Sequence, residues 1–135
     1  MTPQIPAEYK DLIDGPVVVS LVTVMPDGQP QATPVWCNSD GDHILVNTAR
    51  GRRKDKNMTA NPRVTILAID PQDPYRWMEV RGMVVESTED GAVEHINALA
   101  KIYRGRDQYY TNPDQAARET RVTYKIQPLR VIARG

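Results

Sequence analysis

The chain has one cysteine, no phenylalanine and no long run of apolar residues. A single cysteine, Cys37, excludes an internal disulfide and suits a reducing compartment. No stretch approaches the roughly 20 apolar residues that a bilayer-spanning helix needs, and the first residues lack the basic-then-apolar pattern of a signal peptide. Because 17 basic residues balance 17 acidic ones, no charge excess points to a nucleic acid or a membrane as partner. We therefore expect a cytoplasmic protein that acts on a small molecule.

Metal-ligating and nucleophilic residues are equally scarce. The two histidines, His43 and His95, and Cys37 are too few and too far apart in sequence for a metal site or a convincing nucleophile pair. The dinucleotide-binding glycine fingerprint and the Walker phosphate loop are both missing. The sequence therefore nominates no catalytic side chain and no metal ligand.

The order of β-like runs and turns predicts a mainly β (α+β) fold in a single domain spanning residues 1–135. Short strands joined by tight turns, with few helices, are typical of a small antiparallel barrel with peripheral helices. The expected strands are Val17–Met25, Pro30–Asn38, His43–Thr48, Arg63–Asp70, Arg76–Ser87, and one or two closing strands at Arg121–Gln127 and Leu129–Arg134. A loop is expected at Pro71–Pro74. Because side chains fill a small barrel, a large ligand must lie outside it, and a second copy of the chain could supply its other wall.

Helices are expected at three further places and at the basic segment described below. A short helix covers Pro6–Asp14, and a helical turn covers Asp114–Glu119. The longest helix, Glu89–Arg104, should be capped by Thr88. Its apolar residues recur at helical spacing and predict one face packed on the sheet: Val93, Ile96, Leu99, Ala100 and Tyr103.

The segment between residues 48 and 63 is the most informative part of the chain. It holds five basic side chains from Arg50 to Lys56, opposed only by Asp55, between two predicted strands. A strand end followed by a helix start brings backbone N–H groups and guanidinium groups together, which is an arrangement that binds phosphate. Cations at a helix start oppose the helix dipole unless an anion joins them. The alternative interpretation is an ordinary solvated helix face.

Two aromatic segments are candidate walls for a planar ligand. Tyr75 and Trp77 begin a strand after a proline-rich loop, where they either stack on a ligand or cover the barrel end. Thr33, Pro34, Val35 and Trp36 lie within a strand, and Pro34 cannot donate to a β ladder. That strand therefore has an edge or a bulge there, which either exposes backbone groups to a ligand or is simply an edge-strand proline.

In their order and spacing, these segments resemble the split β-barrel superfamily of pyridoxamine-5'-phosphate-oxidase-like proteins. More narrowly, they resemble its branch of deazaflavin (F420)-dependent oxidoreductases. The resemblance covers nearly the whole chain and rests on five segments: Thr33–Trp36, Val46–Asn57, Asn61–Val64, Tyr75–Gly82 and Ile96–Tyr103. It implies a split barrel of about six to seven mostly antiparallel strands, and a homodimer with cofactor sites at the subunit interface.

The resemblance also implies which residues bind the cofactor. Arg53 and Lys54 match the pair that holds the phosphate, and Thr48 and Arg52 complete its cradle. The segment Thr33, Pro34, Val35 and Trp36 would lie along the tricyclic ring. Tyr75 and Trp77 match positions that reach the cofactor from the partner chain, and Arg81 is a looser match.

The implied function is an F420-dependent reductase that passes hydride to a planar conjugated substrate such as a biliverdin, a quinone or an enone. Extra basic groups, Arg50 and Lys56, would suit the phosphodiester and carboxylates of the F420 tail. An FMN-binding oxidoreductase of the same fold is the first alternative. A non-catalytic cofactor carrier or polyanion-binding module is the second.

Overall fold

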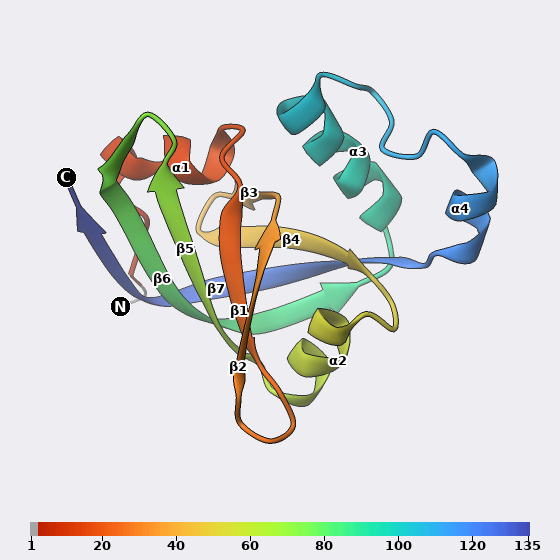
Figure 1. Ribbon diagram of the computed structural model, residues 1–135, viewed down its shortest axis with the longest axis horizontal. Helices are drawn as coiled ribbons and strands as arrows, with labels where there is room; N and C mark the ends of the chain where they lie inside the picture. The colour runs from red at the N-terminus through yellow and green to blue at the C-terminus, as the bar shows by residue number, and fades with distance from the viewer. Residues whose placement is uncertain (1–2) are drawn as a thin grey trace.

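The computed structural model describes residues 3–135 and consists of one antiparallel sheet curled into a half-barrel (Figure 1). The strand order is β2-β1-β5-β6-β7-β4-β3. This arrangement confirms the predicted mainly β, split-barrel fold. The strands are β1 (Val19–Val24), β2 (Pro30–Val35), β3 (Cys37–Asp40), β4 (His43–Ala49), β5 (Arg63–Asp70), β6 (Asp73–Thr88) and β7 (Arg121–Arg134). The helices are α1 (Asp11–Asp14), α2 (Arg53–Ala60), α3 (Ala92–Arg104) and α4 (Pro113–Arg118), preceded by a 3-10 turn at Ala7–Tyr9.

The predicted strand Pro30–Asn38 is wrong in one respect, because the structure divides it at Trp36. β2 pairs with β1, whereas β3 pairs with β4, so the two halves form opposite edges of the sheet. Pro34 lies on the edge strand β2, where its missing N–H costs no ladder bond. The Tyr103 hydroxyl fixes the junction: it accepts from the Cys37 N–H at 3.1 Å and lies 3.2 Å from the Cys37 carbonyl. The chain therefore crosses between sheet edges at Trp36.

Two long strands, β6 and β7, form the back of the half-barrel (Figure 1). The predicted loop Pro71–Pro74 is shorter than expected because β6 already begins at Asp73, and the two predicted closing strands are one strand. The register shifts between Arg81 and Gly82, opposite Pro128, where the ladder lacks a donor. A Cβ at Gly82 would come within 2.7 Å of Ile126 Cγ2, so this close approach requires glycine.

The core fills the inside of the curl and is closed by two short helices. Alternate residues of the strands face inward, which is the period expected of a half-buried strand. α1 covers one end with Leu12 and Ile13, and α2 covers another with Met58. The largest fully buried side chains from the strands are Leu21, Ile44, Ile66, Met78, Tyr124 and Ile126.

α3 packs on β4 and β7 beside the half-barrel (Figure 1). It begins after Gly91, which adopts a positive φ of 74°, so Thr88 is not its cap as predicted. Thr88 instead accepts a hydrogen bond from the Asp90 N–H at 3.1 Å in the preceding turn. Ile96, Leu99 and Ala100 are buried as predicted, but Val93 is 47% exposed and lies off the packed face.

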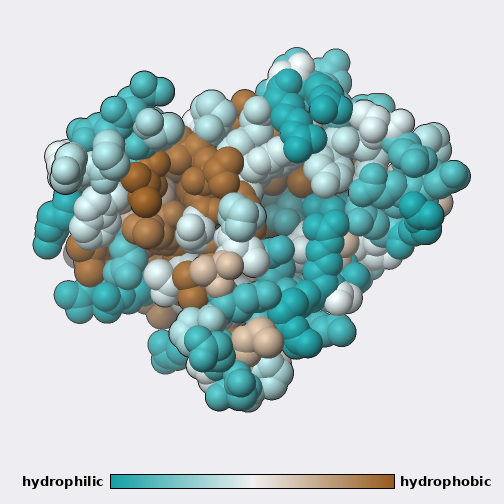
Figure 2. All heavy atoms as spheres, viewed as in Figure 1, coloured by the Kyte–Doolittle hydropathy of each residue, from teal (hydrophilic) through white to brown (hydrophobic). Residues whose placement is uncertain are grey.

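The outer face of the sheet carries an apolar surface. Figure 2 shows hydrophobic residues gathered over β5 and its neighbours. Four apolar side chains line a shallow hollow there together with Glu79 and Arg81: Leu67, Ile69, Trp77 and Ile132. They alternate with inward-facing residues along their strands, and no helical residue of the described chain lines this hollow. None of the helices in this range is long and apolar enough to cross a membrane.

Candidate functional site

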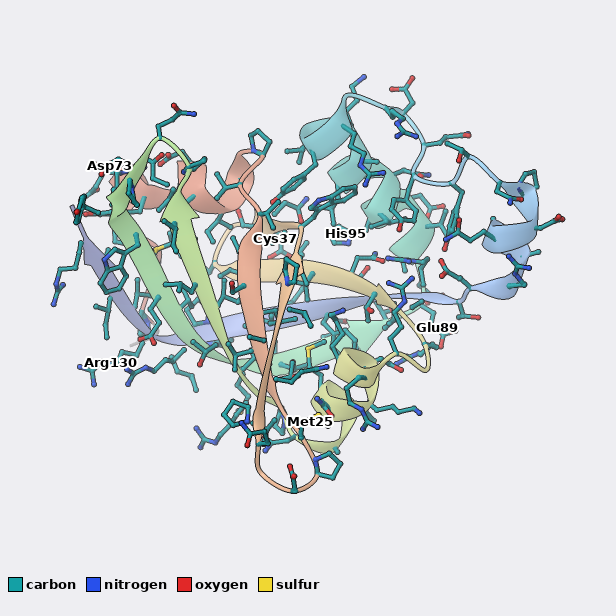
Figure 3. All side chains as sticks on the ribbon, in the orientation of Figure 1. Met25, Cys37, Asp73, Glu89, His95 and Arg130 are labelled. Atoms are coloured by element: carbon teal, nitrogen blue, oxygen red, sulfur yellow. The ribbon has the colours of Figure 1, made fainter. Side chains whose placement is uncertain are left out.

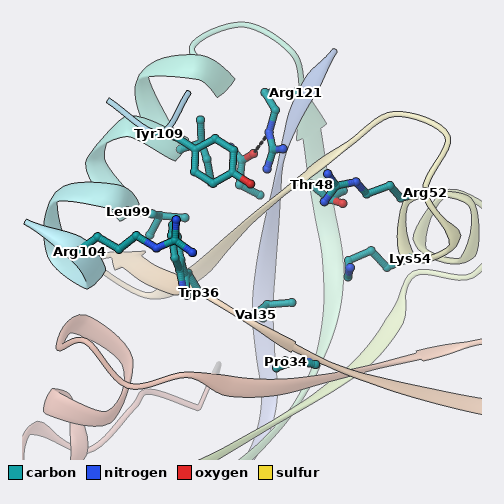
Figure 4. A pocket seen from close by; sticks show the side chains of 12 residues that line it. Pro34, Val35, Trp36, Thr48, Arg52, Lys54, Leu99, Arg104, Tyr109 and Arg121 are labelled. Atoms are coloured by element: carbon teal, nitrogen blue, oxygen red, sulfur yellow. Dashed lines mark hydrogen bonds between the residues drawn. The ribbon is translucent and has the colours of Figure 1, made fainter. Parts of the chain in front are cut away.

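A cleft of about 240 Å³ opens between α3, the start of α2 and the strands β2, β4 and β7 (Figure 4). Its walls come from segments that are far apart in sequence, brought together where the chain crosses from β2 to β3. The lining residues are Pro34, Val35, Trp36, Asn47, Thr48, Arg52, Lys54, Ile96, Leu99, Arg104, Tyr109 and Arg121.

The cleft brings together six of the ten residues predicted to bind a cofactor. They come from the two segments that the sequence singled out, the edge strand and the basic turn. In Figure 4 these segments face one another across the cleft. The six residues are Pro34, Val35, Trp36, Thr48, Arg52 and Lys54.

Positive charge is concentrated in this cleft, where four basic residues and no acidic residue form the lining: Arg52, Lys54, Arg104 and Arg121. Behind them, the Glu119 carboxylate lies 2.9 Å from Arg52 and 3.4 Å from Arg121. Lys54 has no ion-pair partner within residues 3–135. Burial, and then the charges of Arg52 and Arg121, lower the pKa of its ammonium group. The cleft therefore has an excess of positive charge that an anion would stabilise.

Asp55 holds the basic turn in shape. Its carboxylate accepts hydrogen bonds from the Gly51 N–H at 2.9 Å, from Arg50 at 3.0 Å and from the Tyr124 hydroxyl at 2.5 Å. Burial alone would raise the pKa of Asp55, but the bonds from Tyr124, Gly51 and Arg50 lower it. Arg50 also pairs with Glu89 at 2.9 Å. Asp55 and Glu89 together hold Arg50 outside the cleft lining. Asp55 is the only acidic residue of the basic segment, and because it pairs with Arg50, the charge of Lys54 stays uncompensated.

Thr48 supplies the most direct sign of a ligand. Its residue is 1% exposed, and its hydroxyl oxygen has no hydrogen-bond partner in the described structure. A buried hydroxyl without a partner loses the hydrogen bonds that water would give it. The neighbouring helix α2 begins at Arg53, and its N-cap residue, Arg52, makes no side-chain capping hydrogen bond. An anionic group at this spot would accept from Thr48 and face the positive end of α2, so the residues present fit a cofactor phosphate.

The other end of the cleft is aromatic. Trp36 stacks on Tyr103 with ring centroids 5.1 Å apart and meets Tyr109 edge-on at 6.0 Å. The Arg104 guanidinium lies 4.8 Å from the Trp36 ring centroid. These stacked aromatic side chains form a wall of the kind that accommodates a planar ring. The cleft is thus cationic at one end and aromatic at the other.

Four predicted residues lie away from the cleft lining. Arg53 lines a separate depression on the other side of α2, together with Lys56. Thr33 is half-buried on β2. Tyr75 is 83% exposed, and Trp77 lies on the apolar outer face of the sheet, where Arg81 also lies. In one chain, none of the four lines the same cleft as Lys54.

Six lining residues were not predicted: Asn47, Ile96, Leu99, Arg104, Tyr109 and Arg121. The apolar spacing of α3 indicated core packing, and Ile96 and Leu99 do pack, while also forming the cleft floor. The segment holding Tyr109 has no regular pattern. Arg121 starts a strand in an otherwise balanced sequence. No local signal distinguished these residues, because the fold alone brings them to the basic turn.

Cys37, His43 and His95 do not form a catalytic group. The Cys37 thiol is buried and lies 3.6 Å from the Ile13 carbonyl, and burial raises its pKa to about 12. His95 faces the sheet from α3 (Figure 3) and bonds to asparagine side chains. His43 pairs with Asp40 on the β3–β4 hairpin. Within residues 3–135, no three His, Cys, Asp or Glu side chains are grouped to hold a metal.

Comparison with known proteins gives a family and several solved structures. Residues 5–135 match the family described as pyridoxamine 5'-phosphate oxidase. A structure described as F420 reductase is 34% identical to this chain, with a TM-score of 0.81 over 95% of this chain and 98% of that one. A conserved hypothetical protein of Mycobacterium tuberculosis is 25% identical, with a TM-score of 0.74 over 98% and 86%. HutZ, the heme storage protein from Vibrio cholerae, is 16% identical with a TM-score of 0.67 over 98% and 96%, and shares the fold. Curated proteins give no significant match.

Proposed function

Since the chain belongs to the pyridoxamine 5'-phosphate oxidase family, we propose that it is an F420-dependent oxidoreductase. The 34% identity to a protein described as F420 reductase supports the choice of cofactor. The observation that carries the proposal is the two-ended cleft. Its aromatic end suits a planar ring, and its cationic end suits the phosphodiester that follows the ring in F420.

The cationic end would hold the phosphodiester. Lys54 supplies an unpaired ammonium group, and Thr48 supplies a buried hydroxyl that has no protein partner within residues 3–135. Arg52 is already fixed by Glu119 at 2.9 Å, so it loses little conformational freedom on binding. Charge-assisted hydrogen bonds of this kind are about twice as strong as neutral ones.

The edge strand would bind the ring. Pro34 and Val35 line the cleft on the side of β2, and Trp36 stands at its end. When bound, reduced F420 supplies a hydride to an electron-poor conjugated substrate, for which we propose a biliverdin, a quinone or an enone. The protein then contributes position and electrostatics. The proton that completes the reduction would come from solvent water, so no lining side chain is needed as acid or base.

We further propose that the protein is a cytoplasmic homodimer in which the outer sheet face meets its copy. Ile69 is 44% exposed on this face beside Trp77, and a monomer gains nothing from exposing contiguous apolar surface. Tyr75 and Trp77, which lie outside the cleft in one chain, would then reach the cofactor of the other subunit. We expect Trp77→Ala to weaken both dimerisation and cofactor binding. A monomeric variant with full affinity would contradict the role of the partner subunit.

Parallel fluorescence titrations with F420 and FMN test the proposed cofactor. We expect saturable binding of F420 with a lower Kd than that of FMN. Tighter binding of FMN, with a flavin absorption spectrum in the purified protein, would favour the FMN-dependent alternative of the same fold. Binding of F420 without reduction of any of the three substrate types would favour a cofactor carrier. RNA affinity with a steep salt dependence and no F420 binding would favour a polyanion-binding module.

A further inference from the structure

We propose that His95 is a positioning residue: through Asn47, its neutral ring orients the Arg121 guanidinium in the cofactor cleft. This inference rests on the proposed function, because it assigns Arg121 to the same anion site. Arg121, Asn47, His95 and Asn38 come from four elements, β7, β4, α3 and β3, and they form one chain of hydrogen bonds leading away from the cleft.

The chain of bonds begins at the cleft with Arg121. Arg121 is 5% exposed, and its Nε donates to the Asn47 side-chain oxygen at 2.8 Å, the bond drawn as a dashed line beside Arg121 in Figure 4. Its guanidinium carbon lies 5.1 Å from the centroid of the Tyr109 ring. Its Nη1 also lies 3.4 Å from the Glu119 carboxylate, a longer contact than the bond to Asn47. A buried guanidinium held in this way presents its remaining N–H groups in one direction.

Asn47 passes the constraint on to His95. Its amide nitrogen lies 2.9 Å from the Ala92 carbonyl, 3.0 Å from His95 Nδ1 and 3.4 Å from the Thr123 hydroxyl. The Ala92 carbonyl can only accept, and Arg121 can only donate, so the amide orientation is fixed at both ends. The second N–H points at the nearer of the two remaining neighbours, Nδ1 at 3.0 Å rather than the Thr123 hydroxyl at 3.4 Å, so Nδ1 accepts. The Thr123 hydroxyl lies 3.4 Å from Nδ1 and can donate to it as well.

His95 must therefore be neutral, with its proton on Nε2. The Nε2–H group donates to the Asn38 side-chain oxygen at 2.8 Å. Among the described residues, no carboxylate contacts the ring, and the charged group beside it is Arg121. Burial, and then the Arg121 charge, lower the pKa of His95 from 6.5 to about 4. A proton on Nδ1 would oppose the Asn47 N–H and turn the amide, leaving Arg121 Nε without its acceptor.

Two matched amide variants test this arrangement. An asparagine at position 95 can place its side-chain oxygen where Nδ1 lies, whereas a glutamine is one methylene longer and reaches toward the Nε2 position. We expect His95→Asn to keep the F420 Kd within about twofold of the natural protein, and His95→Gln to raise it roughly tenfold, as for the loss of one charge-assisted hydrogen bond. Equal Kd values for the two variants would overturn the proposal.

A measurement on the natural protein needs neither variant nor ligand. Nitrogen-15 NMR of the His95 ring reports its tautomer, and we expect a neutral ring protonated at Nε2 throughout pH 6–8. A ring that is charged at pH 6, or protonated at Nδ1, would overturn the proposal. If the natural protein binds neither F420 nor FMN, the proposed function fails, whereas the NMR result still decides whether the ring has the required form. If the natural protein and both His95 variants bind F420 equally well, whereas Lys54→Ala does not bind it, only the positioning role of His95 fails.

Discussion

Two ionic clusters in this molecule, one around Arg76 and one in the cleft, differ in how their positive charge is compensated. At the β5–β6 turn, the Arg76 guanidinium donates to both oxygens of Asp11 at 2.7 and 2.9 Å, to Asp70 at 2.9 Å and to the Glu8 carbonyl at 2.6 Å. Of the four cations that line the cleft, only Arg52 and Arg121 have a carboxylate partner among the described residues, and it is the same one, Glu119. The first cluster is complete, and the second is short of negative charge.

This difference separates a structural role from a ligand-binding one. Arg76 joins α1 to the sheet, and its carboxylate partners raise its pKa. Lys54 is partly buried beside other cations, and its pKa is lowered instead. A fold maintains such an uncompensated cluster only at a cost in stability, which bound anions offset. This uncompensated charge supports the proposal that the cleft binds an anion.

The largest effect should follow removal of the uncompensated charge. We expect Lys54→Ala to weaken F420 binding by about 1.5–3 kcal/mol, the range for hydrogen bonds to charged groups. Stability should not fall, because Lys54 has no ion-pair partner to lose within residues 3–135. Fluorescence titration and thermal unfolding measure the two quantities. Lys56→Ala is the matched control on the same helix. The sequence suggested that Lys56 meets the F420 tail, but in the structure it is exposed and lies outside the cleft lining, so this variant should bind normally.

Arg53→Ala then decides which side of α2 binds the anion. The resemblance to flavin-binding relatives assigns Arg53 to the phosphate, but in the structure it lines the depression that holds Lys56. If the variant loses as much affinity as Lys54→Ala, the ligand contacts both sides of the helix start. If it behaves like Lys56→Ala, the cleft side alone binds the phosphate.

Protonation of His95, which adds a positive charge beside Arg121, should also have a large effect, in this case on the free energy of unfolding. Burial, and then the charge of Arg121, lower the pKa of His95 from 6.5 to about 4 in the folded protein. Between these values the unfolded chain binds more protons, so stability falls as the pH falls. From pH 8 to pH 5 this amounts to roughly 2 kcal/mol. Urea unfolding should show the loss in the natural protein and a smaller loss in His95→Asn, which cannot titrate. Equal losses would contradict the role of His95 in acid sensitivity.

Breaking the compensated cluster should have the opposite pattern. We expect Arg76→Met to lower the Tm by roughly 5 °C, as for the loss of one well-ordered ion-pair network in a domain of this size. The affinity for F420 should not change, because Arg76 is not among the residues that line the cleft of its own chain. Thermal unfolding in low and high salt measures the effect, and salt should reduce the difference between variant and natural protein. A Tm unchanged at low salt would mean that this cluster contributes nothing.

The sequence predicted most secondary-structure elements and the basic turn well, because each has a recognisable local pattern of residues. Runs of β-like residues located six of the seven strands within a few positions, all except β3, and the run from Arg50 to Lys56 located one wall of the cleft. The break at Trp36 was missed because residues 30–38 read as one continuous β segment. What splits it is a distant hydroxyl, that of Tyr103 on α3.

The remainder of the cleft could not be predicted because it depends on which elements meet. Arg121 and Asn47 are neighbours only because β7 pairs with β4. Sequence alone also could not show that Asp55 is turned toward Arg50 and Tyr124, leaving Lys54 unpaired. In the sequence, the single acidic residue Asp55 could neutralise any of the neighbouring basic residues. The structure shows that it neutralises Arg50 and not Lys54.

The smallest expected effect is that of Thr48→Val, which should weaken cofactor binding without lowering stability. This combination distinguishes a ligand-binding hydroxyl from a structural one. Thr48→Val keeps the side-chain volume and removes a buried hydroxyl that has no partner in the described protein. The free energy of unfolding should therefore stay the same or rise by a few tenths of a kcal/mol, because the substitution removes no hydrogen bond from the folded protein. F420 binding should weaken by about 1 kcal/mol if the hydroxyl donates to the phosphodiester. Lower stability with unchanged affinity would instead mean that the hydroxyl has a partner within the protein and no ligand role.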